Sequence, residues 1–297
     1  MNILKSILGP MRVPFLVLTP ACVLLGVGSA VWTSGHVEVP HVILALIGAI
    51  AAHISVNALN EYFDFKSGLD FKTKRTPFSG GSGTLPEKPE KARYALATGL
   101  ITFAVTALVG VYFLSIRGLL LLPLGIAGLL VIFFYTIWFT RNPLLCLIVP
   151  GLGFGPLMVM GIDFVLTGSY SLTAFFASLV PFFLVSNLLL LNQFPDIEAD
   201  KSVGRRHFPI IVGARTSSFI YGAFLLMAYI SIILGVNLKS LPVTSLIGLI
   251  TIFIAAPTFV GAYRYGEDIK KLMPYMGLNV VINILTPVLV ATGLFIG

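Results

Sequence analysis

Long apolar runs separated by short polar stretches make up most of this chain. Each run approaches the ~20 residues that a helix needs to cross the hydrocarbon core of a membrane. A helix also satisfies its own backbone polar groups in lipid, and the alternating pattern of a barrel strand is absent. We therefore predict an all-α integral membrane protein with nine spans. Their approximate limits are Phe15–Trp32, Val42–Phe63, Tyr94–Ser115, Gly118–Phe139, Leu144–Leu166, Thr173–Phe194, Ser217–Val236, Pro242–Tyr263 and Tyr275–Ile296.

Composition supports this pattern and excludes a soluble domain. Of 297 residues, 57% are hydrophobic and 10% are charged, whereas soluble domains carry about 25% charged residues. The polar stretches 64–93 and 195–216 are too short for a separate domain, so residues 1–297 are expected to form one membrane domain. The first run lacks the pattern of a cleaved signal, and we expect it to remain as a span.

The basic residues predict the orientation of the spans. With the N-terminus in the cytoplasm, every Lys and Arg lies on the inner side except Arg117 and Lys239, as the positive-inside rule requires. The net charge of +7 is therefore placed where anionic lipid head groups and phosphorylated substrates are met, and it does not require nucleic acid. This predicts a multi-pass protein of the cell membrane.

Two acidic segments end the second and sixth predicted spans, NEYFDFKSGLD (Asn60–Asp70) and NQFPDIEAD (Asn192–Asp200). Carboxylates next to lipid are costly and are usually retained for function. In the first segment and the span before it, His53, Asn57, Asn60 and Asp64 are four, three and four residues apart, which places them on one helix face. By the same spacing, Asn192, Asp196 and Asp200 are expected to share one face of the sixth helix.

These side chains predict a magnesium site at the cytoplasmic face. Oxygen ligands without cysteine favour Mg²⁺ over zinc, and Asp70 and Glu198 add nearby carboxylates. The predicted ligands are Asn60, Asp64, Asp70, Asp196 and Asp200. Basic residues at the same face suit a diphosphate, to which Asn192 also lies close; they are Arg75, Arg141, Lys201, Arg205 and Arg206.

Several structural alternatives remain open. His53 alone is more often a core residue than a ligand, and Asn57 can bridge two helices. Arg205 and Arg206 can serve only as positive-inside anchors. The glycine-rich FSGGSG (Phe78–Gly83) lacks the pattern of a nucleotide-binding loop, so it is either a cap over the acidic segment or an ordinary turn. A transporter would instead hold its carboxylates near the bilayer midplane.

The acidic segments resemble those of the UbiA-type intramembrane prenyltransferases. The carrying residues are Asn60-Glu61-xx-Asp64, with the later acid Asp70, and Asp196-xxx-Asp200. The resemblance implies nine helices around a central cavity that opens to the cytoplasmic side. It also implies an enzyme that uses Mg²⁺ to transfer a polyprenyl group from its diphosphate to an aromatic acceptor, with catalytic residues Asn60, Asp64, Asp70, Asp196 and Asp200. The face of Tyr135 is expected to steady an allylic cation.

Within that family the chain is most similar to the 1,4-dihydroxy-2-naphthoate prenyltransferases of menaquinone synthesis. The similarity is carried by Tyr62–Asp70, Gly80–Gly83, Tyr135-Thr136, Gly151–Gly161 and Leu166-Thr167-Gly168. Three positions depart from the pattern. Glu61 replaces the common Asp, Gly68 precedes an acid that comes two residues late, and Phe154 stands where the naphthoate branch has an acidic residue. Acceptors such as 4-hydroxybenzoate, homogentisate or a glycerol phosphate lipid precursor therefore remain alternatives.

Overall fold

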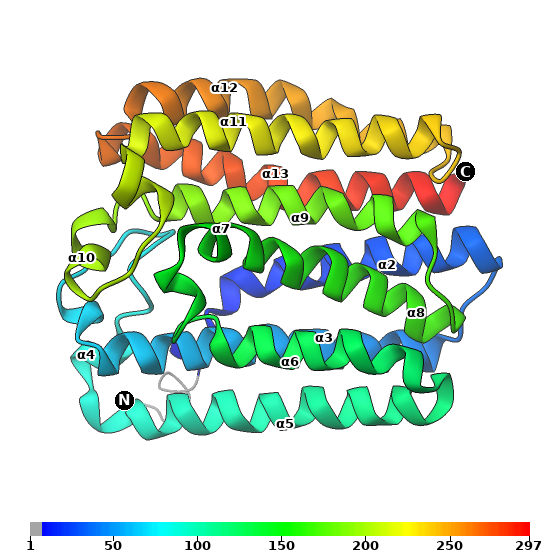
Figure 1. The fold of residues 1–297 in the computed structure, drawn as a ribbon, viewed down its shortest axis with the longest axis horizontal. Coiled ribbons are helices and arrows are strands. Elements are labelled where there is room, and N and C mark those ends of the chain that lie inside the picture. Colours follow the sequence, from blue (N-terminus) through cyan, green and yellow to red (C-terminus); the bar gives the residue numbers. More distant parts are fainter. Residues whose placement is uncertain (1–7) are drawn as a thin grey trace.

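The structure, a computed structural model, describes residues 8–297, and its regular elements are helices laid side by side (Figure 1). The longer helices are α2 (Leu18–Ser34), α3 (Val39–Lys66), α5 (Ala92–Arg117), α6 (Leu122–Phe134), α7 (Pro143–Leu152), α9 (Leu172–Asn192), α11 (Phe208–Asn237), α12 (Ile252–Tyr265) and α13 (Ile269–Ile296). Shorter segments connect them: η1 (Val13–Val17), η2 (Leu69–Phe71), α4 (Thr84–Glu87), η3 (Pro89–Lys91), η4 (Leu119–Leu121), η5 (Phe139–Arg141), η6 (Gly153–Met160), α8 (Gly161–Thr167), α10 (Ile197–Ser202) and η7 (Val243–Thr251).

Eight helices within residues 8–297 are long and apolar enough to cross a membrane. The fourth predicted span, Gly118–Phe139, instead contains a shorter apolar helix, Leu119–Phe134, so the count of nine full spans is not confirmed. After Phe134 the chain forms turns and η5 rather than continuing as helix. This early end leaves Tyr135 on a turn at the end of the bundle that carries the acidic segments.

Two buried apolar clusters hold the helices together. The larger one joins α2, α7, α9, α11, α12 and α13, and α9 contributes Val180, Leu184 and Leu191 to it without measurable exposure. The smaller one joins α2, α3, α5 and α8 around Phe113 and Phe164. Large apolar side chains also cover the outside, for example Phe253, which is 82% exposed. Such a surface belongs in lipid, and the chain is an integral membrane protein.

The fifth predicted span changes its helix type where its sequence reads PGLGFGP (150–156). Pro150 and Pro156 cannot donate backbone hydrogen bonds, and the chain changes from α7 to the π-helical η6 at Gly153. Gly151 and Gly155 lie against α9 so closely that a Cβ atom would come within 2.1 Å of Phe182 O and 2.5 Å of Ser178 O, respectively. The glycines therefore allow a close approach that directs Phe154 into a central cavity.

The acidic segments meet at one end of the bundle, near α4 and α10 in Figure 1. The prediction that Asn192, Asp196 and Asp200 share one continuous helix is wrong, because α9 ends at Asn192 and α10 begins at Ile197. Pro195 lies between them and cannot extend the α9 hydrogen-bond ladder. All three side chains nevertheless line the same cavity, so the turn replaces the helix without separating them.

Candidate active site

A cavity of about 260 Å³ opens among α2, α3, α7, α9, η6 and the loops at the acidic end of the bundle. The predicted face of α3 is confirmed, since His53, Asn57, Asn60 and Asp64 all line this cavity. The opposite wall carries Asn192, Asp196 and Asp200, and Tyr135 and Asp70 close the rim. Every predicted carboxylate except that of Glu198 therefore faces one space, while Glu198 is exposed and lies outside it.

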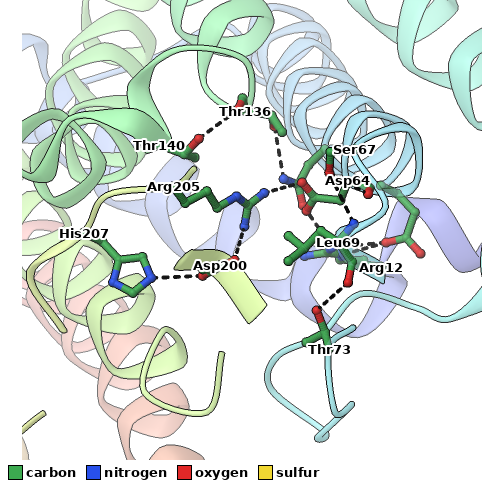
Figure 2. A network of polar contacts seen from close by, with 12 residues as sticks. Arg12, Asp64, Ser67, Leu69, Thr73, Thr136, Thr140, Asp200, Arg205 and His207 are labelled. Carbon is green, nitrogen blue, oxygen red and sulfur yellow. Dashed lines mark hydrogen bonds and ion pairs between the residues drawn. The ribbon is translucent and has the colours of Figure 1, made fainter. Parts of the chain in front are cut away.

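Arg205 joins the two acidic segments (Figure 2). Its guanidinium donates to Asp64 Oδ1 and, at 3.0 Å, to Asp200 Oδ1. Asp200 Oδ2 is also hydrogen-bonded to His207 Nε2 at 3.0 Å. Burial alone would lower the pKa of Arg205, but Asp64 and Asp200 raise it above its usual value. A fixed positive charge thus lies between two carboxylates that would otherwise repel each other.

Other oxygens at the cavity have no partner. Asp70 Oδ2, Asn192 Oδ1 and Asp196 Oδ1 are buried and make no hydrogen bond within residues 8–297. Burial, with help from Glu61 and Asp64, raises the pKa of Asp70 to about 7. Burial and the charge of Asp200 likewise raise the pKa of Asp196 to about 7. Since unpaired buried acceptors are costly, these oxygens are suited to a cation or a hydrogen-bond donor from a ligand.

Glu61 fixes the glycine-rich loop instead of facing the cavity. Its buried carboxylate accepts from Arg12 at 3.1 Å and from the backbone N–H of Ser82 at 2.9 Å. Gly81 has φ +70°, and a Cβ atom there would lie 3.2 Å from Asp70 Oδ1 and 3.3 Å from Glu61 Oε2. Residues 78–81 line the cavity, so the loop caps the acidic segment, as one of the two alternatives for FSGGSG predicted.

Arg12 and Thr136 each form one hydrogen bond with the Asn60 side chain. Asn60 Oδ1 accepts from Arg12 at 3.0 Å, and Asn60 Nδ2 donates to Thr136 Oγ1 at 3.1 Å. The oxygen that a metal would need is therefore already engaged in this structure. Asn60 orders the wall on which Asp64 lies, and its predicted role as a metal ligand stays a prediction.

Of the five predicted diphosphate cations, only Arg205 lines the cavity. Arg75 is exposed and pairs with Glu87 at 3.2 Å, while its other nitrogen donates to Ser82 O at 3.1 Å. The remaining three are exposed and lie outside the lining; they are Arg141, Lys201 and Arg206. The structure therefore places four of the five at the surface around the entrance.

Arg12 and His207 line the cavity and were not among the predicted site residues. Arg12 lies just before the first span, where a single Arg beside an apolar run is the only signal. His207 is 1% exposed and its Nδ1 has no partner within residues 8–297. Arg12 meets the first acidic segment only through the fold, because it lies 49 positions from Glu61, whereas His207 lies seven positions from its partner Asp200.

A second, almost wholly apolar cavity of about 310 Å³ lies between α3, α5, α6 and η6. It shares five wall residues with the first cavity, namely Ala52, Val131, Ile132, Gly153 and Met158. On its far side Gly110, Gly125 and Gly128 leave open space where side chains would project. The acidic chamber therefore lies next to this apolar cavity, which is called the apolar branch below.

The donor set fits a divalent cation, although it is not a closed metal cage. Within residues 8–297 no three His, Cys, Asp or Glu side chains converge as metal ligands. Arg205 already bridges Asp64 and Asp200, so these two carboxylates are directed at its guanidinium and not at a common metal position. The orphaned oxygens of Asp70 and Asp196 nevertheless match Mg²⁺, which usually takes one or two carboxylates and completes its shell with water and phosphate oxygens.

These observations define a class of protein: an integral membrane helical bundle in which two acidic segments face each other across a chamber that shares part of its wall with an apolar cavity. The sequence profile of the UbiA prenyltransferase family matches residues 19–295. The chain belongs to this family, as the acidic motifs predicted.

Individual relatives agree with this assignment. The 1,4-dihydroxy-2-naphthoate octaprenyltransferase of Bacillus subtilis (strain 168) is 27% identical over 194 residues, covering 63% of this chain. The chain spans about 60% of the length of the curated relatives it matches. An apo UbiA homologue from Aeropyrum pernix K1 has a TM-score of 0.72 at 17% identity, covering 95% of this chain and 97% of that one.

A further solved structure extends the likeness of fold. A UbiA homologue from Archaeoglobus fulgidus bound to GPP and Mg²⁺ has a TM-score of 0.64 at 16% identity, and the match covers 95% of this chain and 98% of that one. At such identities the likeness establishes the shared helical architecture.

Proposed function

We propose that this protein transfers a polyprenyl group from its diphosphate to an aromatic acceptor, most specifically 1,4-dihydroxy-2-naphthoate in menaquinone biosynthesis. The observation that carries the proposal is the pair of facing acidic segments with orphaned carboxylate oxygens beside an apolar branch. Family membership supports the reaction class. The naphthoate acceptor is supported by the relative from Bacillus subtilis and by the similarity of Tyr62–Asp70 and Gly151–Gly161.

Mg²⁺ is the cofactor of this proposal, as in the homologue bound to GPP and Mg²⁺. Asp64, Asp70, Asp196 and Asp200 would hold it, with Asn192 beside them. When bound, it supplies positive charge to a diphosphate leaving group. Asp64 and Asp200 also pair with Arg205, whereas Asp70 and Asp196 each keep one buried oxygen without a partner within residues 8–297.

Two arginines that line the chamber bind the anionic donor. Arg205 and Arg12 are held in place by Asp64, Asp200 and Glu61, so their charge is fixed before a ligand arrives. Preorganised donors of this kind stabilise charge that develops on a leaving oxygen. The exposed Arg75, Arg141, Lys201 and Arg206 contribute a positive field around the entrance, which attracts anionic donors.

The apolar branch receives the prenyl chain. Its walls are aliphatic, and its glycines leave room for a chain that would otherwise contact lipid. The same apolar surroundings exclude water, which protects an allylic cation from hydrolysis. Tyr135, at the rim of the chamber, presents an aromatic ring to such a cation.

We infer that the protein lies in the cell membrane with the chamber on the cytoplasmic side. All Lys and Arg except Arg117 and Lys239 belong to that side by the positive-inside rule. Polyprenyl diphosphates are charged and water-facing at one end, so a chamber at the basic face meets them directly. The acidic segments lie at the ends of α3 and α9, not at mid-helix as a transporter site would.

A defined reaction tests the proposal. The purified protein in lipid vesicles is incubated with Mg²⁺, a polyprenyl diphosphate and, separately, 1,4-dihydroxy-2-naphthoate, 4-hydroxybenzoate, homogentisate and glycerol 1-phosphate. Mass spectrometry is expected to find a prenylated naphthoate product that has lost CO₂, and none with EDTA. Product from another acceptor alone would overturn the naphthoate assignment, and no prenylated product from any acceptor would overturn prenyl transfer.

A further inference from the structure

The imidazole of His53 lies in the chamber, away from the carboxylates proposed to hold Mg²⁺. His53 is 6% exposed and lines the cavity, and its Nδ1 is hydrogen-bonded to Thr19 Oγ1 at 2.7 Å. Its Nε2 makes no hydrogen bond within residues 8–297. The ring is therefore held through one nitrogen at the wall of the cavity, while the other nitrogen has no hydrogen bond within residues 8–297.

The position of His53 separates it from the diphosphate end. It lies seven residues from Asn60 and eleven from Asp64 on α3, which at 1.5 Å per residue is about 10 Å and about 16 Å along the helix. Its neighbour Ala52 belongs to the wall shared by the acidic chamber and the apolar branch. A group bound at His53 thus lies deeper than the diphosphate, where the prenyl chain enters the apolar branch.

Phe154 faces His53 from η6. The ring centroids are 4.8 Å apart and the planes meet at 81°, an edge-to-face contact. Phe154 offers a flat apolar wall for an aromatic ring, but it cannot accept a hydrogen bond. An imidazole nitrogen accepts either a hydrogen bond or a proton, so this part of the chamber combines an aromatic wall with one polar acceptor.

We propose that His53 Nε2 binds the hydroxyl of the aromatic acceptor and takes up its proton during prenyl transfer, with Phe154 as the stacking wall and Thr19 holding the ring. This proposal rests on the proposed function. The prenyl acceptor that fits this site is a hydroxylated aromatic ring, because the site offers one nitrogen that can accept a hydrogen bond, surrounded by apolar side chains. The tautomer required is the one in which Nδ1–H donates to Thr19, leaving the lone pair on Nε2.

In this prenyl transfer, each bond that breaks is matched by a bond that forms or by a leaving group. The bond between the first prenyl carbon and its oxygen breaks, and the electron pair leaves with the diphosphate. The ring carbon that bears the carboxylate forms the new carbon–carbon bond, while the hydroxyl proton passes to His53 Nε2 and leaves a ring ketone. Loss of CO₂ then returns the bonding electrons to the ring, and His53 gives the proton back to the oxygen.

Steady-state kinetics on His53→Gln test the proposal, with the exposed His36→Gln as the matched control. At saturating donor, kcat/KM for 1,4-dihydroxy-2-naphthoate is expected to fall on the order of 10²-fold, the lower end of the range for general base catalysis. The KM for polyprenyl diphosphate is expected to stay within about twofold, because general base loss leaves donor binding intact.

A double-mutant cycle separates this role from a packing role. Thr19→Val removes the hydroxyl that orients the ring, so it is expected to lower acceptor kcat/KM by about tenfold, whereas residues acting as one unit are not additive. His53→Gln/Thr19→Val should therefore be no worse than His53→Gln alone. If His53→Gln fails to fold, Thr19→Val still decides, since it keeps the side-chain volume.

A second substitution at Phe154, which faces His53, gives the most specific test of the role of His53. A carboxylate introduced by Phe154→Glu reaches the space opposite His53, so His53→Gln/Phe154→Glu is expected to recover part of the lost acceptor kcat/KM. Wild-type kinetics in His53→Gln, or equal losses for donor and acceptor, would overturn the role of His53 while prenyl transfer survives. Absence of aromatic prenylation by the wild-type protein would overturn the proposed function and this role together.

Discussion

Buried carboxylates lie at both ends of the helical bundle, and their surroundings differ. On α8, at the end away from the acidic segments in Figure 1, Asp163 is fully buried. Its two oxygens accept from Ser29 Oγ at 2.8 Å and from Ser171 Oγ at 2.9 Å. At the other end, Asp70 and Asp196 each leave one buried oxygen without a partner in residues 8–297.

The arginines repeat this difference. Arg117, near Asp163, donates to the carbonyl oxygens of Val165 and Leu166 at 2.7 and 2.8 Å, so it closes a helix end. Arg205 bridges the carboxylates of Asp64 and Asp200. Asp163 and Arg117 thus have their hydrogen bonds within the protein, whereas Asp70 and Asp196 keep oxygens that a ligand can bind. The comparison teaches that partner geometry, more than burial, separates a structural carboxylate from one available to a ligand.

The largest expected effect comes from exchanging one carboxylate at each end. Asp196→Asn should reduce prenyl transfer by on the order of 10²-fold or more, by analogy with the loss of one transition-state donor, because it removes charge from the proposed Mg²⁺ site. Asp163→Asn should leave turnover unchanged and lower the free energy of unfolding by about 1–3 kcal/mol through a disturbed hydrogen-bond pair. Turnover and thermal unfolding in detergent measure both; equal turnover in the two variants would erase the distinction.

The two arginines give the next effect. Arg205→Gln leaves Asp64 and Asp200 buried without their shared cation, and breaking a buried ion pair costs roughly 3–5 kcal/mol. Arg117→Gln removes only hydrogen bonds to neutral carbonyls and is expected to cost about 1–2 kcal/mol. Denaturation in detergent with and without Mg²⁺ compares them: Mg²⁺ should restore part of the stability of Arg205→Gln alone, and an equal response of Arg117→Gln would contradict a cation site at the acidic end.

The raised pKa values of Asp70 and Asp196 predict a pH effect for the metal-free protein. Both are about 7 in the folded chain against about 3.9 in an unfolded one. Between these values the folded state holds more protons, so stability falls as pH rises toward about 7 and then levels off. Thermal unfolding in EDTA should show this slope, and Asp70→Asn/Asp196→Asn should flatten it. Stabilisation by Mg²⁺ should grow from pH 6 to pH 8, since metal binding requires ionised carboxylates.

The smallest expected effect concerns two serines that donate to buried carboxylates. Ser82 donates to Glu61 at the chamber, and Ser171 donates to Asp163 at the other end. Ser82→Ala should loosen the glycine-rich cap and raise the donor KM about threefold, a loss of well under 1 kcal/mol that is typical of a partly exposed hydrogen bond. Ser171→Ala should change only the unfolding temperature. A raised donor KM in Ser171→Ala, or none in Ser82→Ala, would show that the cap does not act on the donor.

The sequence predicted most of the architecture because local patterns determine it. Apolar length located the helices, and four- and three-residue spacing placed His53, Asn57, Asn60 and Asp64 on one wall. The early end of α6 was missed, since span length alone does not reveal where tertiary packing stops a helix. The turn after α9 was also missed, although Pro195 is a local signal for it. The π-helical η6 coincides with the prolines and glycines of PGLGFGP (150–156), but the pattern does not reveal that Gly151 and Gly155 pack against α9.

The sequence predicted the acidic residues of the candidate site better than its basic residues. Carboxylates near lipid are so rare that each one by itself suggests a functional site. Basic residues are common on one side of a membrane protein for topological reasons, so the sequence did not distinguish the partly buried Arg205 from the exposed Arg206. Arg12 reaches Glu61 and Asn60 only because η1 and the end of α3 come together, which is a property of the folded chain.

Isothermal titration of Mg²⁺ into the protein holding a non-cleavable polyprenyl thiolodiphosphate tests the central claim most directly. Wild type and Asp163→Asn are predicted to bind Mg²⁺ with the same affinity, and Asp196→Asn to bind it at least tenfold more weakly, because one carboxylate ligand is gone. Equal Mg²⁺ affinity in all three proteins, or no binding in the wild type, would contradict an account in which the two acidic segments form a metal–diphosphate site.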